Sequence, residues 1–309
     1  MPMSGRVQHD IEGWGMVDRS SRLPVAAFAL LGIIWGSNFI YMKLAAELIT
    51  PMQIVFFRVL FGFLPVCLYA KLSGVLRLEH LRHSLHFVVM SLLATSVYYY
   101  GFAKGTSLLL SGVAGALSGA IPLFAFVLAI SFIAEEKASL MKIVGVAVGF
   151  VGVALVARPS GDSLVSSNLT GVLYMVGGSL SVGASFVYAR KFISPLRIPA
   201  AALTTYQLGY AMVMLSLFTD YDGMANVWTD MHASLGLVIG LGLLGTGLAY
   251  IIYYYIVEKM GAVTAASVTY IPPVVALFVG SVLVGEPIGL LDYFAAALIF
   301  VGVYLLRRR

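Results

Sequence analysis

The chain contains one stretch twice, as SGVAGALSGAIPLFAFVLAISFIAEEKASLMKIVGVAVGFVGV at residues 111–153 and GAVTAASVTYIPPVVALFVGSVLVGEPIGLLDYFAAALIFVGV at residues 261–303. The copies align without a gap, and both close on Phe-Val-Gly-Val. Each matched position lies 150 residues downstream of its mate, as Glu286 does of Glu136. An internal repeat of this kind indicates that the chain consists of two related halves.

The composition indicates a membrane protein. Charged residues make up 11% of the 309 residues and apolar residues 60%, whereas soluble domains average about 25% and about 45–50%. The Lys and Arg residues lie between apolar runs instead of forming one face, so we expect no nucleic-acid partner. The single cysteine, Cys67, cannot form an intrachain disulfide and is interpreted as a packing residue.

Apolar runs of about 20 residues can span a bilayer as helices, and the chain contains ten candidates. They are expected at residues 23–42, 51–70, 84–103, 108–131, 138–157, 169–189, 199–219, 233–257, 261–283 and 287–306. The fifth and tenth carry charges near their starts, Lys142 and Asp292, which are again 150 positions apart. We therefore predict a polar cytoplasmic extension at 1–22 and five-helix repeats at 23–159 and 160–309.

The distribution of positive charge sets the expected orientation. With the N-terminus inside, most Lys and Arg residues fall in cytoplasmic segments, and the segment with Asp220, Asp222 and Asp230 falls outside without a cation. Both termini are therefore expected in the cytoplasm. Because five crossings return the chain on the opposite side, the second half is inverted, and inverted repeats are typical of transporters.

A second pair of matched blocks lies near the start of each half. GSNFIYMK at 36–43 matches GASFVYAR at 183–190, at an offset of 147 residues. The motif positions are Trp35, Gly36, Ser37, Asn38, Phe39, Arg58, Glu135, Glu136, Gly145, Glu286 and Gly302. With them the chain resembles the EamA-type drug/metabolite transporter superfamily over residues 23–306, and within it the bacterial exporters of aromatic amino acids.

The resemblance implies a basket-shaped bundle around a central cavity. The cavity would be lined mainly by the first, third, fourth, sixth, eighth and ninth helices, with the fifth and tenth packed outside it. In one departure, Val182 stands in the second half where the first half has Trp35. Any role of the tryptophan is therefore not two-fold symmetric.

Matched prolines are expected to interrupt the fourth and ninth helices. Pro122 and Pro272 remove a backbone hydrogen bond where a helix would otherwise continue, and Gly119 and Pro273 lie beside them. We predict kinks near the midplane, since matched interruptions in both halves indicate a transporter binding site. The alternative is that the prolines only shape packing, because prolines are common in membrane helices.

Polar and aromatic residues on the predicted helices form the candidate substrate site. The set is Trp35, Asn38, Tyr41, Tyr99, Ser185, Tyr188, Tyr254 and Tyr270. The amide of Asn38 would be unsatisfied in lipid, and aromatic rings favour a substrate that stacks. The alternatives are interhelical hydrogen bonds for the polar groups and an interfacial belt for the tyrosines.

The charges in the predicted spans limit the substrate. Arg58 is the one fixed charge clearly inside a span, where it either faces the bundle or snorkels to the interface. No Asp or Glu is expected near the middle of a span, which argues against proton coupling through a carboxylate relay and against a strongly cationic substrate. A neutral molecule such as an aromatic or large apolar amino acid fits best.

Other functions fit less well. His80, His83 and His86 have a spacing that could bind a metal on a helix, but no catalytic motif or P-loop accompanies them, which disfavours an intramembrane enzyme. A channel or scaffold stays open as an alternative, because Gly145 and Gly149 form a close-packing motif. We predict a bacterial inner-membrane exporter that works by alternating access without catalytic residues, metal or cofactor, its partners being a small-molecule substrate and the bilayer.

Overall fold

The computed structural model describes residues 19–157, 165–261, 265 and 267–307, and within these residues every regular element is a helix. Seven helices are long and apolar enough to cross a membrane: Arg22–Ala46, Pro51–Leu72, Leu78–Leu108, Ser111–Phe132, Leu169–Leu196, Ala200–Phe218 and Met231–Met260. Shorter apolar helices lie at Leu140–Val156, Ser267–Leu283 and Leu290–Leu306. The all-helical prediction is confirmed, and whether the three short helices cross the membrane stays a prediction.

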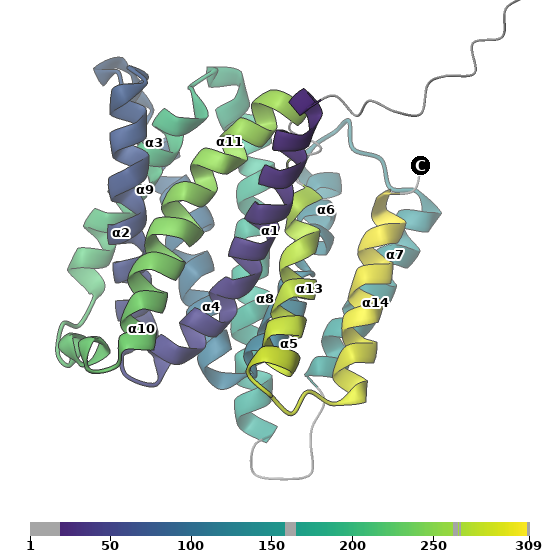
Figure 1. The fold of residues 1–309 in the computed structure, drawn as a ribbon. Coiled ribbons are helices and arrows are strands. Elements are labelled where there is room, and N and C mark those ends of the chain that lie inside the picture. Colours follow the sequence, from purple (N-terminus) through teal and green to yellow (C-terminus); the bar gives the residue numbers. More distant parts are fainter. Residues whose placement is uncertain (1–18, 158–164, 262–264, 266, 308–309) are drawn as a thin grey trace, which may run out of the picture.

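The helices form one bundle, with α1 starting and α14 ending at its upper end in Figure 1. The first part contains α1 (Arg19–Ala46), α2 (Pro51–Leu72), η1 (Leu78–His83), α3 (Ser84–Ser91), η2 (Leu92–Ser96), α4 (Val97–Leu108), α5 (Ser111–Ser118), α6 (Ile121–Phe132) and α7 (Leu140–Val156). The second part contains α8 (Val165–Tyr188), η3 (Ala189–Ile193), η4 (Ser194–Leu196), α9 (Ala200–Phe218), η5 (Met224–Thr229), α10 (Met231–Leu235), η6 (Gly236–Leu248), α11 (Ala249–Met260), η7 (Ser267–Tyr270), α13 (Ile271–Phe278), η8 (Val279–Leu283) and α14 (Leu290–Arg307).

The predicted domain limits fall mostly outside the described residues. Most of the extension at 1–22 and the boundary between 159 and 160 lie there. The described part of α1 begins at Arg19, so its first turn overlaps the predicted extension. Helices are expected throughout, because apolar chains in lipid must satisfy their backbone groups internally.

Glycines bring α7 and α14 into backbone contact at one edge of the bundle (Figure 1). A Cβ on Gly145 would lie 2.7 Å from the carbonyl oxygen of Gly302, and one on Gly152 would lie 2.6 Å from that of Ala295. The two contacts correspond to each other in the repeat, because Gly145 matches Ala295 and Gly152 matches Gly302 at the offset of 150 residues. The close-packing motif at Gly145 and Gly149 is therefore used within the chain.

A second pair of contacts follows the same correspondence. A Cβ on Gly36 of α1 would lie 2.5 Å from the Val275 Cβ of α13, and one on Gly183 of α8 would lie 3.0 Å from the backbone nitrogen of Ala125 of α6. Gly183 is 147 residues after Gly36, and Val275 is 150 residues after Ala125. In Figure 1, α1 begins at the upper end of the bundle and α8 at the lower end.

The matched prolines stand at helix starts, not in helix interiors as predicted. A turn at residues 119–120, which includes Gly119, separates α5 from α6, and Pro122 lies in the first turn of α6. Pro272 lies in the first turn of α13, after η7, and Pro273 beside it is buried. A proline in a first turn loses no hydrogen bond, because the first N–H groups of a helix have no partner within it. In the fourth segment, Ser111–Phe132, the interruption thus takes the form of a two-residue turn at residues 119–120.

Candidate functional site

A buried arginine lies at the meeting point of four elements. Arg58 of α2 is 4% exposed, and its Nε donates to Thr246 Oγ1 of η6 at 3.1 Å. The guanidinium carbon lies 3.9 Å from the ring centroid of Tyr99 of α4. The side-chain amide of Asn38 of α1, oriented to satisfy both polar atoms, accepts from Arg58 Nη2 at 3.2 Å and donates to the Ile34 carbonyl at 3.1 Å. We call Asn38, Arg58, Tyr99 and Thr246 the Arg58 cluster.

Local structure at the start of α2 sets the depth of Arg58. Thr50 and Gln53 form a capping box, in which Gln53 Oε1 accepts from the Thr50 N–H at 3.0 Å and Thr50 Oγ1 accepts from the Gln53 N–H at 3.4 Å. Gln53 Nε2 also donates to the carbonyls of Asp220 and Asp222, each at 2.8 Å. These bonds tie the start of α2 to the segment before η5, so that Arg58 lies within the bundle instead of at its end.

Small residues let η6 approach the arginine. A Cβ on Gly62, one turn after Arg58, would lie 2.5 Å from Thr246 Cγ2, and one on Gly245 would clash with the Asn38 amide. The Thr246 hydroxyl donates to the Leu241 carbonyl at 3.0 Å. Its oxygen is therefore free to accept from Arg58, since a hydroxyl has one proton and two lone pairs.

Tyrosines extend the Arg58 cluster toward α9 and α11. Tyr250 interacts with Tyr99, and its ring stacks near that of Tyr254 with centroids 6.3 Å apart. The hydroxyl of Tyr254 is hydrogen-bonded to that of Thr204. On the other side, the Tyr98 and Tyr99 rings have centroids 4.9 Å apart. The cluster therefore combines one cation with a set of aromatic rings.

Three of the eight predicted site residues lie in this cluster or are joined to it, and two more, Trp35 and Tyr41, lie on the same helix as Asn38. Asn38 and Tyr99 belong to it, and Tyr254 joins it through Tyr250. The ring of Trp35 lies 6.1 Å from that of Tyr253. Tyr41 packs against η6, where a Cβ on Gly236 would lie 3.0 Å from its ring.

The other three predicted residues have different surroundings. The Ser185 hydroxyl donates to the Val182 carbonyl of its own helix at 2.7 Å. The Tyr188 hydroxyl is hydrogen-bonded to His86 Nδ1 at 2.8 Å, near the end of α8. Tyr270 is half-buried and packs against the main hydrophobic core. The structure therefore does not bring Ser185 and Tyr188 to Arg58.

A sequence signal for the missed residues lies in a second, shorter repeat. Leu-Leu-x-Thr occurs at 92–95 and at 243–246, an offset of 151 residues. Its threonines have matched partners: Thr246 accepts from Arg58, and Thr95 accepts from Gln207 Nε2 at 2.8 Å. Gln207 lies 149 residues after Arg58. The second half thus has a neutral amide where the first half has a cation.

Equivalent carboxylates have different partners at the two ends of the bundle. The oxygens of Glu286 accept from the N–H groups of Ser111 and Gly112 at 2.7 and 2.9 Å, at the start of α5. Its mate Glu136 instead forms an ion pair with Arg190 at 3.0 Å. The carboxylates at two matched positions of the repeat therefore have different partners, backbone N–H groups for Glu286 and a cation for Glu136.

The cations that match across the repeat also differ in their partners. Lys43 lies 147 residues before Arg190, but its Nζ donates to the carbonyls of Ser107 and Leu109 at 3.3 and 2.8 Å. These carbonyls end α4, where a cation is favourable because of the helix dipole. At the end of the bundle with Lys43 and Glu286, the charged side chains bond to backbone groups of neighbouring helices. At the end with Arg190 and Glu136, the two side chains form an ion pair with each other.

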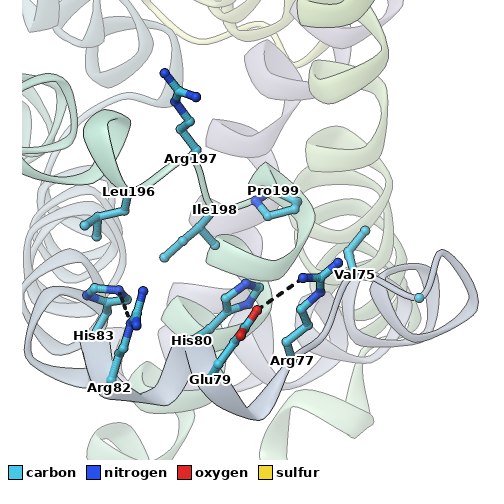
Figure 2. Close-up of a pocket in the computed structure, with 11 residues that line it drawn as sticks. Val75, Arg77, Glu79, His80, Arg82, His83, Leu196, Arg197, Ile198 and Pro199 are labelled. Atoms are coloured by element: carbon cyan, nitrogen blue, oxygen red, sulfur yellow. Dashed lines mark hydrogen bonds and ion pairs between the residues drawn. The ribbon is translucent and has the colours of Figure 1, made fainter.

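A polar cavity of about 310 Å³ opens at one end of the bundle, between the segments that precede η1 and α9. Its polar lining consists of Arg77, Glu79, His80, Arg82, His83 and Arg197. Figure 2 shows Arg77 paired with Glu79 and Arg82 bonded to His83, with Arg197 pointing away from both pairs. Among the described residues no group of three or more His, Cys, Asp or Glu side chains could hold a metal ion.

A second cavity, of about 300 Å³, lies between the end of α1 and α10. Its lining includes the acidic residues Glu47 and Asp230 together with His232. The basic cavity lies in segments predicted to be cytoplasmic and the acidic cavity in segments predicted to be outside. The two cavities are interpreted as lying at opposite ends of the bundle.

Comparisons with known proteins agree with this architecture. The sequence model of the EamA-like transporter family matches residues 22–158 and residues 169–308. An uncharacterized transporter of Archaeoglobus fulgidus is 23% identical, and the match covers 91% of this chain and 97% of that protein. The uncharacterized inner membrane transporter YedA of Escherichia coli is 27% identical, with coverages of 91% and 89%. A crystal structure with a TM-score of 0.62 and 21% identity, over 94% of this chain and 97% of the other, has the same fold.

Proposed function

The chain belongs to the EamA-like transporter family, and from this premise we propose that it is an exporter of small amphipathic metabolites that works by alternating access. The expected substrates are amino acids with aromatic or large apolar side chains. The expected location is a bacterial inner membrane, with ten spans in two inverted repeats and both termini in the cytoplasm. Family membership itself makes the chain a multi-pass membrane protein and points to a non-enzymatic role.

The observation that carries the proposal is the unequal use of the duplicated carboxylates. In an inverted repeat, exchange of conformations between the halves closes one end of the bundle while it opens the other. Glu286 docks on the start of α5, whereas Glu136 pairs with Arg190. Two arrangements of one matched group are what such an exchange requires, because each half adopts in turn the conformation of its mate.

The matched contacts support the repeat that this mechanism needs. The pair Gly145 and Gly302 corresponds to the pair Ala295 and Gly152. The opposite starting ends of α1 and α8 in Figure 1 support the inversion. The tyrosines around Arg58 support an aromatic substrate, because ring stacking adds to the free energy of apolar burial.

A channel or scaffold without alternating access is the alternative proposal. The observation in its favour, the close-packing glycine motif, loses weight because α7 uses these glycines against α14 of the same chain. A channel would pass substrate down its gradient without accelerated exchange. A carrier would exchange labelled for unlabelled substrate faster than it moves net substrate.

Transport in proteoliposomes tests the proposal. Vesicles that contain the purified protein are loaded with unlabelled L-phenylalanine, and uptake of labelled L-phenylalanine by counterflow is measured. We expect saturable uptake that is absent from protein-free vesicles. The proposal is refuted if none of the twenty amino acids and no small aromatic acid shows saturable counterflow.

A further inference from the structure

We infer that Arg58 is the anchor for an anionic group of the substrate, so that the transported molecules carry a carboxylate on an apolar or aromatic body. This rests on the proposed transport function and deepens it by naming the substrate class. The inference starts from the charge at Arg58, which a site for purely neutral molecules does not need.

Among the residues that the structure describes, Arg58 has no counter-ion. Within the described residues no Asp or Glu forms an ion pair with it, although it is only 4% exposed. A buried ion costs several kcal/mol unless charge and hydrogen bonds compensate it. Its neighbours supply two neutral oxygens and an aromatic face. The site is therefore short of one negative charge.

The guanidinium also keeps hydrogen-bond donors for a ligand. Arginine has five N–H groups, and the polar contacts use one at Nε and one at Nη2, while Nη1 contacts only the Met42 sulfur at 4.0 Å. N–H groups thus remain at both Nη atoms. Two such donors in one plane match the oxygens of a carboxylate.

The surroundings define the rest of the ligand. The face of the guanidinium is covered by Tyr99, and Tyr98, Tyr250 and Tyr254 continue the aromatic surface. None of these groups carries a negative charge that would attract an ammonium. The matched position in the other half is Gln207, so the cluster holds a single cation. One carboxylate on an aromatic body satisfies all of these features, and an amino group adds little.

The competing explanation is a structural arginine that only joins α1, α2, α4 and η6. A structural role predicts that removal of Arg58 weakens every ligand and the fold together. An anchor predicts a loss that depends on the carboxylate of the ligand. The two roles therefore differ in ligand selectivity.

Binding by the detergent-solubilised protein separates these explanations without requiring transport. The probes are phenylacetate, phenylacetamide, phenethylamine and L-phenylalanine, and the readouts are quenching of tryptophan fluorescence and ligand-dependent thermal stabilisation. We expect phenylacetate to bind about 10- to 100-fold more tightly than phenylacetamide, the range expected for one hydrogen bond to a charged group. Equal affinities for the acid and the amide would overturn the inference.

Variants of Arg58 then test the residue itself. Arg58→Gln should lower phenylacetate affinity about 10- to 100-fold and change phenylacetamide affinity less than about threefold, while Arg58→Lys should restore part of the selectivity because it keeps the charge. Lys71→Gln, an exposed cation at the end of the same helix, should change neither affinity. A uniform loss for all four probes in Arg58→Gln would establish the structural role. Selective binding without counterflow would refute the transport proposal alone.

Discussion

In the proposed alternating access, removal of the charge on Glu286 should favour the arrangement in which its end of the bundle is open. Its carboxylate accepts two backbone N–H groups, from Ser111 at 2.7 Å and Gly112 at 2.9 Å. Glu286→Gln keeps one acceptor oxygen and places an NH₂ group against the other N–H. At least one hydrogen bond to a charged group is lost, at about 1.5–3 kcal/mol, together with about 0.3–1 kcal/mol of interaction with the helix dipole. A total of about 2–4 kcal/mol shifts the equilibrium about 30- to 700-fold toward the open arrangement.

The shift is measured by labelling a cysteine with a membrane-impermeant maleimide. The reporter is Leu110→Cys, just before α5, in a Cys67→Ala background that removes the native thiol. We expect the labelling rate to rise with the population of the open arrangement, provided that labelling is slower than the exchange. The matched control is Glu136→Gln. Glu136 pairs with two cations, Arg190 at 3.0 Å and Lys142 at 3.6 Å, on partly exposed side chains, so loss of each ion pair costs at most about 1 kcal/mol. Equal labelling rates in the two variants would refute the reasoning.

Three further substitutions test other parts of the structure. Gly302→Ala places a Cβ 2.5 Å from the Gly145 carbonyl oxygen and should lower the melting temperature in detergent. Gly177→Ala, whose Cβ meets nothing within 4 Å, should leave the melting temperature unchanged or raise it. A similar fall in both variants would contradict the α7–α14 contact. Asn38→Ala should reduce the initial rate of counterflow several-fold, with folded protein retained on gel filtration, while Ser185→Ala should keep the wild-type rate. Equal rates in the wild type and the two variants would place the site elsewhere. Gln53→Leu removes the capping box and two hydrogen bonds to carbonyls, so it should lower the stability of the start of α2 by about 2–3 kcal/mol at about 1 kcal/mol per bond. Amide hydrogen exchange at the start of α2 that is no faster than in the wild type would argue against this.

The helical segments could be predicted because they depend on local patterns. Runs of apolar residues set where helices lie, and the seven long apolar helices and three short ones occupy the predicted places. The break near Pro122 was predicted as a kink. The pattern locates an interruption, but whether a proline ends one helix or starts another depends on the turn before it, here at residues 119–120.

The site was predicted only in part, because it depends on how each helix is rotated in the bundle. The sequence predicts Asn38 and Tyr99 as site residues, but for Arg58 it allows both an orientation toward the bundle and snorkelling to the interface. Its burial follows from the contacts of Gln53 and from the approach of η6 at Gly62, which join residues far apart in sequence. Ser185 occupies the position equivalent to Asn38, yet Gln207 stands in the second half where the first half has Arg58.

The glycine contacts between α7 and α14 determine where the halves can turn. Two helices in backbone contact at both Gly145 and Gly152 have little room to slide, so in the proposed alternating access this edge would act as a pivot. For a rigid rotation, each atom is displaced in proportion to its distance from the pivot. The greatest travel then falls on the helices farthest from this edge, in Figure 1 the side of α2 and α9. In the proposed mechanism, the distance through which Arg58 moves would thus be set by a pair of helices that contribute no residue to its cluster.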